Sequence, residues 1–310
     1  TLCHPRTGSR TRSLTTTTRR WSGIVEAGIV PEITEGIHPN IPNDVYHAET
    51  GWWSSTQLKG LLSEHYKPVT GESDAMRFGT LVHTAVLEPD LLDAYVTLDA
   101  AKVGLKADGT PAANPYMTGA WKKAAAEVEA DGCIPVALAD MELALRMRDA
   151  VAAHPTAAAL LLSADGVSEE SVFVFDDDAV KHKARFDRRI PGAIVDLKTT
   201  SSKPGAAVLG RTVLDYGYDL SAAHYLEVAA LAGLDAGAFA WVFVDKTPDG
   251  PRVTVAEPDA ALLERGRVLR ARALARAAGT LPAYEGATGY LTLTCPPWAQ
   301  PQEEMEGATS

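Results

Sequence analysis

KHKARFDRRIPGAIVDLKTT, residues 181–200, decides how this chain folds. Polar and apolar residues alternate through 180–187, and 193–199 is rich in residues that favour β-structure, so both segments are predicted to be strands. Pro191 and Gly192 stand between them and are typical of a turn. The stretch therefore predicts two antiparallel strands joined by a short turn.

Three of the charged residues on these strands are predicted to converge. Side chains two residues apart point to the same face of a strand. Asp187 therefore shares a face with Lys183 and Arg185 on the first strand. Asp196 and Lys198 share a face on the second strand, and the residues on either side of Asp196 point the other way. The antiparallel arrangement predicts that Asp187 and Asp196 lie near each other, with Lys198 alongside.

Eight residues separate Asp187 from Asp196, and one residue separates Asp196 from Lys198. This spacing is the PD-(D/E)xK nuclease pattern. Paired carboxylates are hard oxygen ligands that suit Mg²⁺ or Mn²⁺. A metal ion there polarises a scissile phosphate and lowers the pKa of an attacking water, and the lysine orients that water and offsets the phosphate charge. The alternative interpretation of residues 196–198 is a solvated strand edge, because Asp-x-Lys occurs by chance in many proteins.

The elements around this stretch predict an α/β protein. Apolar residues at helical spacing predict helices at about 57–62, 75–88, 119–131, 137–152, 219–233 and 257–278. Short β-rich runs predict strands at about 171–175, 180–187, 193–199 and 238–244, while 100–118 is expected to be a loop. The middle of the chain therefore runs helix, three-stranded meander, helix, strand. We predict a PD-(D/E)xK restriction-endonuclease-like core, a mixed sheet flanked by helices.

Four segments resemble the RecE-type (exonuclease VIII-like) phage exodeoxyribonucleases of the PD-(D/E)xK superfamily. They are YHAETGWWSSTQLKGLL (46–62), MRFGTLVHTAVLEP (76–89), KHKARFDRRIPGAIVDLKTT (181–200) and YDLSAAHYLEVA (218–229). Together they span most of residues 46–245. The resemblance implies a nuclease that depends on Mg²⁺ or Mn²⁺.

The resemblance also implies roles for single residues. Asp187, Asp196 and Lys198 correspond to the aspartates and the lysine of the family's catalytic site, and both aspartates are implied to bind the metal. His83 corresponds to a metal ligand or a neighbour of the metal site, although a histidine alone would be interpreted as a surface or core residue. The backbone carbonyl of Leu197 would complete the coordination.

An acidic residue at the start of the first meander strand is implied as a further metal ligand. It corresponds to Glu169, with Glu170 as the alternative, and both could equally be exposed charges at a strand edge. On the following helix the family often carries Gln-x-x-x-Tyr, which implies a catalytic role for Tyr225, with a core position as the equal alternative. Ser221 replaces the glutamine and is implied to contact DNA more weakly, unless His224 or a water compensates.

A cluster of basic residues flanks Asp187. Phosphate binding needs such clusters, so four members are predicted to bind DNA: Lys183, Arg185, Arg188 and Arg189. The alternative is a solvated charged hairpin. The net charge of −11 counts against a general DNA-binding surface, so the contact is expected to be local. Five more arginines in 264–276 are predicted to lie on a solvated helix face.

The chain is predicted to hold one large domain with two tails. Residues 1–45 are expected to be an N-terminal tail, disordered at least over 1–23, where threonine, arginine and serine predominate. Residues 46–280 are expected to form the nuclease domain, and 281–310 an irregular C-terminal tail. No run of about 18 apolar residues occurs, so no membrane span is expected.

The three cysteines limit the class of nuclease. Cys3, Cys133 and Cys295 are scattered and odd in number, which predicts a cytoplasmic protein without a disulfide framework. Three cysteines in one chain are too few for a four-cysteine zinc or iron–sulfur site. This argues against a CRISPR-associated or helicase-linked member of the superfamily, since those commonly hold an iron–sulfur cluster.

We therefore expect an exodeoxyribonuclease that degrades linear double-stranded DNA from its ends. The resemblance implies 5′→3′ polarity that leaves a 3′ single strand, a homo-oligomeric ring, and a RecT-like single-strand annealing recombinase as partner. It also implies a phage or prophage origin and a role in homologous recombination in a bacterial cytoplasm. The alternative is a non-catalytic DNA-binding or phage accessory protein on a degenerate nuclease fold, which the change at Ser221 and the acidic net charge favour.

Overall fold

The computed structural model describes residues 33–39, 41–66, 73–201, 205–247 and 250–283. Its centre is a six-stranded sheet in the order β1-β4-β5-β6-β7-β8. The strands are β1 (Gly36–His38), β4 (Val167–Phe175), β5 (Lys181–Ile190), β6 (Ala193–Thr200), β7 (Ala238–Asp245) and β8 (Val253–Ala256). The predicted disorder of 1–23 and nearly all of the predicted C-terminal tail lie outside the described residues.

Strands β4, β5 and β6 form the predicted meander, because each is antiparallel to the next. The chain then leaves the sheet through α9 (Ala206–Tyr216) and α10 (Tyr218–Leu231). It returns as β7, which runs parallel to β6, as a helical crossover requires. The sequence of elements confirms the PD-(D/E)xK-like mixed α/β core.

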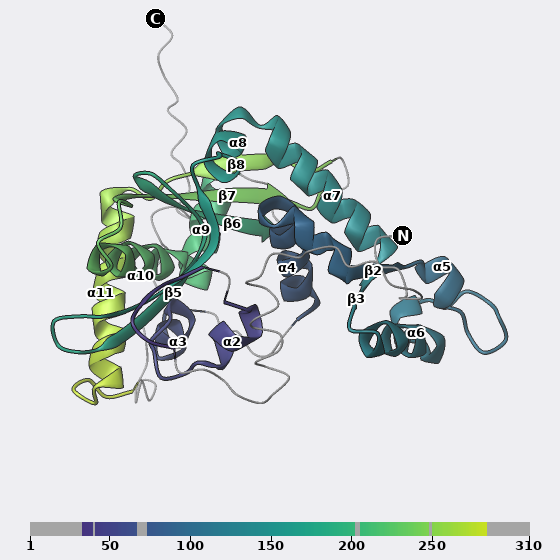
Figure 1. The fold of residues 1–310 in the computed structure, drawn as a ribbon, viewed down its shortest axis with the longest axis horizontal. Helices are drawn as coiled ribbons and strands as arrows, with labels where there is room; N and C mark the ends of the chain where they lie inside the picture. Colours follow the sequence, from purple (N-terminus) through teal and green to yellow (C-terminus); the bar gives the residue numbers. More distant parts are fainter. Residues whose placement is uncertain (1–32, 40, 67–72, 202–204, 248–249, 284–310) are drawn as a thin grey trace, which may run out of the picture.

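Helices cover both faces of the sheet (Figure 1). One face packs on α4 (Asp74–Leu87), α7 (Leu138–Ala153) and α8 (Pro155–Leu161). The opposite face packs on α9, α10 and α11 (Ala260–Ala277). Strand β6 shows the alternation that divides the two cores: Val195 and Leu197 belong to the α4 side, whereas Ile194 belongs to the α10 side.

Side-chain caps begin several of the predicted helices. Ser54 starts α3 (Ser55–Gly60) with a capping box, since its hydroxyl accepts from the Gln57 backbone and the Gln57 side chain accepts from the Ser54 backbone. Ser73 caps α4 by accepting from Met76. The predicted starts of these two helices agree with the structure to within two residues.

Residues 33–39 and 41–45 belong to the predicted N-terminal tail, and the structure packs this N-terminal segment against the sheet. Strand β1 pairs with β4, and α2 (Asn43–Ala48) follows it. Ile33, Ile41 and Val45 form a buried cluster with Phe173 of β4. A three-residue strand and a six-residue helix are too short to give a periodic signal in the sequence. For this reason the segment was predicted to be part of a tail.

A small arm lies between α4 and α7 and projects away from the sheet at the right of Figure 1. Its elements are η1 (Pro89–Ala94), β2 (Tyr95–Leu98), α5 (Ala100–Val103), η2 (Pro115–Met117), α6 (Gly119–Ala130) and β3 (Ile134–Ala137). β2 and β3 form a separate two-stranded parallel sheet. The predicted loop 100–118 thus holds two short helices. Within the described ranges, no helix combines the length and the apolar character that crossing a membrane requires.

Candidate active site

The site begins where β5 and β6 separate. The ladder between these two strands joins Arg188 to Val195, Arg189 to Ile194 and Ile190 to Ala193. Beyond it the Asp187 side chain takes the place of a ladder partner, because the backbone N–H of Leu197 donates to Asp187 Oδ2 at 2.7 Å. The carboxylate is therefore fixed in the opening between the strands.

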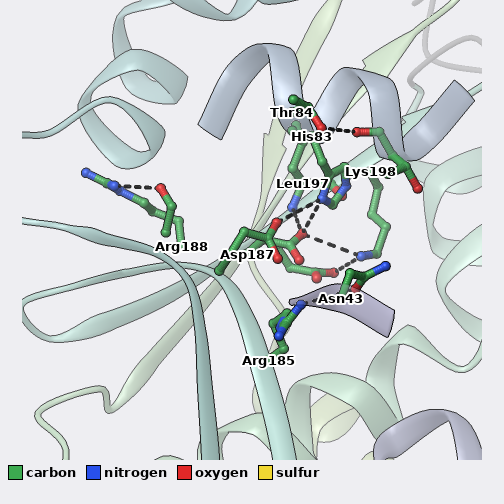
Figure 2. Close-up of polar contacts among 12 residues, drawn as sticks. Asn43, His83, Thr84, Arg185, Asp187, Arg188, Leu197 and Lys198 are labelled. Atoms are coloured by element: carbon green, nitrogen blue, oxygen red, sulfur yellow. Dashed lines mark hydrogen bonds and ion pairs between the residues drawn. The ribbon is translucent and has the colours of Figure 1, made fainter. Parts of the chain in front are cut away.

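His83 reaches this opening from α4 (Figure 2). Its Nε2 donates to the carbonyl oxygen of Leu197 at 2.8 Å. Its Nδ1 lies 3.7 Å from Glu169 Oε1 and 3.7 Å from Asp187 Oδ2. One ligand atom from each of His83, Glu169 and Asp187 lies within 4.8 Å of the others. Residues from α4 and from the two paired strands β4 and β5 thus meet at one point.

Glu169 enters the group through an unusual backbone conformation. Its φ is +50°, in the left-handed region that a side chain other than glycine rarely adopts. Such a conformation costs on the order of 1–3 kcal/mol and occurs preferentially at functional sites. Glu170, the alternative in the sequence, is turned to Arg189, whose Nε and Nη2 donate to its carboxylate at 2.6 and 2.9 Å. The geometry therefore places Glu169, and not Glu170, beside His83.

Asp196 and Lys198 project from the α10 face of β6, as the alternation predicted. Lys198 Nζ lies 2.7 Å from Asp196 Oδ2 and 3.9 Å from Asp187 Oδ2. Asp196 is only 1 % exposed, and neither of its carboxylate oxygens accepts a hydrogen bond of ordinary geometry from the described residues. A buried carboxylate with unused acceptors is costly unless a cation or a donor completes it.

The charges of the site shift one another's pKa values. Burial raises the pKa of Asp196 to about 6, and the Lys198 ammonium opposes this shift. Burial alone would lower the pKa of His83, but the Asp187 and Glu169 carboxylates outweigh it and raise the value to about 9. Burial likewise works against the charged form of Lys198, and Asp196 and Asp187 outweigh it, so the lysine pKa is raised. The site therefore holds excess negative charge around two cations.

This donor set fits a divalent cation. Glu169 and Asp187 offer carboxylate oxygens and His83 a ring nitrogen within one small space. Carboxylates that approach this closely repel each other unless a cation lies between them. The unused oxygens of Asp196 and the carbonyl of Leu197 lie at the same opening. Oxygen-rich sites of this kind suit Mg²⁺ or Mn²⁺.

The helix α10 contributes Tyr225 and two residues that face inward. The Tyr225 ring packs on Phe186 and Phe239, with centroids 5.7 and 6.4 Å apart. Burial, together with Asp196 nearby, raises the pKa of Tyr225, so its hydroxyl stays protonated next to the site. Ser221 is buried, and so is His224. Neither is placed to reach a nucleic acid from where the structure holds it.

Two of the predicted DNA-binding residues are enclosed by the N-terminal segment. Lys183 is 2 % exposed, and its ammonium donates to the carbonyl oxygens of Tyr46 and Glu49. Arg185 donates to Ser171, to Asn43 and to a backbone carbonyl of the same segment. In this arrangement both cations join β5 to α2 and its flanks. The charged end of Lys183 does not reach an open surface, whereas Arg185 is half-buried.

Arg188 and Arg189 also have internal partners. Arg188 donates to the hydroxyl of Ser168 and to the carbonyl of Ser163, and it points away from Asp187 in Figure 2. Arg189 forms the two-pronged pair with Glu170. A phosphate would have to compete with these partners, so their role in DNA binding stays a prediction.

Two residues that the sequence did not single out lie next to Lys198. The centroid of the Tyr218 ring is 5.3 Å from Lys198 Nζ. Lys59 Nζ, from α3, is 5.9 Å from the same ring. Both lie in segments that resemble the family, 46–62 and 218–229, but nothing in the sequence gives either residue a role, because α3 reaches the site only through the tertiary fold.

Comparison with known proteins agrees with this architecture. The family model described as "PDDEXK-like domain of unknown function (DUF3799)" matches residues 55–246, which include every residue of the site. No curated protein matches the sequence.

Three solved structures are similar at low identity. A "Putative exonuclease" from Eubacterium rectale is 16% identical with a TM-score of 0.48, and the match covers 79% of this chain and 89% of that one. SSO0001 is 14% identical with a TM-score of 0.24, over 70% and 84% of the two chains. LHK-Exo in complex with dAMP is 15% identical with a TM-score of 0.24, over 58% and 91%.

Proposed function

Since this chain belongs to the family of PDDEXK-like domains of unknown function (DUF3799), we propose that it is a divalent-metal-dependent exodeoxyribonuclease that degrades linear double-stranded DNA. The observation that carries the proposal is the meeting of His83, Glu169 and Asp187 at the opening between β5 and β6, beside a buried Asp196–Lys198 pair. A fold with this pattern supports a nuclease; the substrate and the metal are our inference from the donor set and the resemblance.

The proposed metal ligands are His83, Glu169 and Asp187, with Asp196 and the carbonyl of Leu197 available to complete the set. A bound Mg²⁺ or Mn²⁺ would polarise the scissile phosphate and increase the acidity of the attacking water. These residues would hold the ion at the opening between β5 and β6. The strained Glu169 fits this role, because it aims a carboxylate that an ordinary strand residue would direct elsewhere.

Lys198 is proposed to bind the phosphate and to orient the water. Asp196 holds its ammonium at 2.7 Å, and burial of the pair restricts its movement. Such a fixed cation stabilises the charge that develops on the phosphate without reorganising during the reaction. Tyr225 keeps its proton and is proposed as a neutral donor at the same edge of the site.

The finer features of the function rest on the resemblance to RecE-type exonucleases. We propose 5′→3′ degradation that leaves a 3′ single strand, a ring of identical subunits around DNA, and a RecT-like annealing recombinase as partner. The same resemblance supports a phage or prophage origin, a role in homologous recombination, and a bacterial cytoplasmic location.

The test is hydrolysis of linear duplex DNA by the full chain in Mg²⁺ or Mn²⁺, compared with a covalently closed circle. We expect release of nucleotides from the linear DNA alone, no release with a chelator, and loss of activity in Asp196→Asn. Persistent degradation by that variant, or none by the wild type in either metal, would overturn the proposal. The second result would favour a non-catalytic DNA-binding or accessory protein.

Glu169 and Glu170 provide a matched pair for the metal site. Both are adjacent glutamates of β4, but only Glu169 lies beside His83, and Glu170 is held by Arg189. Mn²⁺ should raise the melting temperature of the wild type and of Glu170→Gln, because a ligand that binds only the folded state stabilises it. Glu169→Gln should lose most of this increase together with hydrolysis.

A further inference from the structure

The junction between α9 and α10 holds a pair of tyrosines in a fixed position. Gly217 separates Tyr216 from Tyr218 and has φ +64° and ψ +36°. A Cβ on Gly217 would lie 2.6 Å from Lys59 Cδ and 2.8 Å from the Tyr66 ring. Since the backbone conformation and the space both require glycine, the two helices meet at one defined angle. The tyrosines on either side of Gly217 are held by this junction.

The two rings are stacked. Their centroids are 5.9 Å apart and their planes differ by 24°. Tyr218 is half-buried, whereas Tyr216 is 44 % exposed. The inner ring therefore supports an outer aromatic ring that faces solvent. Surface tyrosines are common, but a tyrosine supported from behind in this way resembles the platforms on which nucleobases stack.

Two ammonium groups lie on the inner ring. Lys198 Nζ is 5.3 Å and Lys59 Nζ is 5.9 Å from the Tyr218 centroid, within range for a cation–π contact. Lys59 also donates to the carbonyl oxygen of Tyr216 at 3.3 Å. Burial, and then the Lys198 charge, lower the pKa of Lys59 to about 8, and the Asp196 and Asp219 charges oppose this shift. A phosphate next to Lys59 would favour the charged form of its ammonium.

We propose that Tyr216, Tyr218 and Lys59 form a nucleotide-binding subsite beside Lys198. Tyr216 stacks on a base at the end of the strand that is cut, and Lys59 binds a backbone phosphate next to the scissile one. The inference rests on the proposed nuclease function, since it identifies the ligand as a DNA strand. Stacking is tolerant of sequence because every base has a π-face, so the subsite suits an enzyme that removes nucleotides of any sequence.

The subsite can be tested by base stacking, which is independent of hydrolysis. The probe is a linear duplex that carries 2-aminopurine at one of the first three positions from its 5′ end, with Ca²⁺ in place of Mg²⁺. Binding to the wild type should quench the fluorescence at one of these positions. Tyr216→Ala should abolish the quenching and weaken binding about tenfold, as expected for the loss of one stacked base. Tyr216→Trp should restore both.

Tyr116 provides the matched control, because it is 43 % exposed and also contacts another aromatic ring, but lies on the arm. Tyr116→Ala should leave quenching and affinity unchanged. Lys59→Met should raise KM for linear DNA more than it lowers kcat, and Lys59→Arg should recover part of the loss. If Lys59 had a purely structural role, Lys59→Met would instead lower the melting temperature, and KM would not change more than kcat.

The outcomes separate the subsite from the nuclease function. Hydrolysis by the wild type with unchanged quenching and KM in Tyr216→Ala would overturn the subsite alone. Quenching that depends on Tyr216, without hydrolysis in Mg²⁺ or Mn²⁺, would support the subsite and overturn the nuclease function. Absence of any quenching at the three positions would overturn the subsite.

Discussion

The two ends of β5 carry charged residues that look alike in the sequence and have opposite surroundings in the fold. At the end near Lys183 the ammonium is buried, and two backbone carbonyls of the N-terminal segment accept its hydrogen bonds. At the end near Asp187 the strand separates from β6, and carboxylates approach one another at the opening. At the first end the charge has its hydrogen-bond partners inside the protein. Beside the second end, Asp196 Oδ2 has Lys198 nearby, but Asp196 Oδ1 accepts no hydrogen bond from the described residues.

The difference shows which charges can act on a ligand. A charge whose hydrogen bonds are complete inside the protein stabilises the fold, and removing it leaves other buried groups unpaired. A buried group with unused acceptors, such as Asp196, gains when a cation or substrate arrives. Lys183 and Lys198 therefore form a natural pair for experiment, because they lie on neighbouring strands and differ in this respect.

The largest effect is expected for Lys198→Ala. Loss of the fixed ammonium should lower the rate of DNA hydrolysis about 100- to 1,000-fold, the range typical of removing one preorganised electrostatic contact. The rate is measured on linear duplex DNA in Mg²⁺, with circular dichroism to show that the fold persists. A variant that stays folded and keeps more than about a tenth of the wild-type rate would remove Lys198 from the proposed mechanism.

Lys183→Ala is expected to lower the stability of the fold and to leave the rate of hydrolysis nearly unchanged. It leaves the carbonyls of Tyr46 and Glu49 without their donor and should lower the free energy of unfolding by about 2 kcal/mol. The rate per folded molecule and the affinity for DNA should stay within about twofold of the wild type. Urea unfolding and DNA binding at two salt concentrations check this. A clear loss of affinity with unchanged stability would restore the phosphate-binding role that the sequence suggested.

The smallest effect concerns pH and the same end of β5. The neutral ring of His224 donates from Nε2 to the Lys183 carbonyl and accepts at Nδ1 from Arg270. Both ring nitrogens are therefore occupied, and a second proton on Nδ1 would break the bond from Arg270. Burial, and then the Arg270 charge, lower the pKa of His224 to about 3. The unfolded state binds a proton below about pH 6.5 and the folded state does not. Stability should therefore fall as the pH decreases through this range.

Between pH 6.5 and 5 this histidine should account for about 1.6 kcal/mol of lost stability. In His224→Gln the decline should be smaller by that amount, although the variant starts from a lower value at pH 7. Urea unfolding at several pH values measures both. Equal slopes in the two proteins would mean that His224 accepts its proton in the folded state.

Much of the fold could be predicted because its signals are local. The alternation in β5 and β6 gave the strands, the turn and the face that Asp196 shares with Lys198, and the helical spacing gave α4 with His83. Elements that are short or irregular gave no such signal. β1, α2 and the arm strands were therefore missed or assigned to tail and loop, although Phe173 packs on the N-terminal cluster.

The arginines of α11 show the same limit. A solvated face was predicted, yet Arg265 pairs with the buried Asp219, Arg270 donates to His224, and Arg276 binds Glu64. A helical pattern tells which residues share a face, but not whether another element supplies buried acceptors opposite that face. The basic cluster of β5 was open to the same error, since Lys183 and Arg185 have partners on a segment 134–144 residues earlier.

The sequence by itself determined the order of the central elements α4, α7, β4, β5, β6, α10 and β7, the shared face of Asp196 and Lys198, and the pairing that brings Asp187 close to them. These follow from backbone periodicity and hydrogen bonding between neighbouring segments. Only the tertiary structure decided that Glu169 and not Glu170 joins His83, that Lys183 is enclosed, and that Lys59 meets Lys198 across Tyr218. The physical reason is that the effect of a charge depends on burial and on its nearest partners, and distant segments supply both.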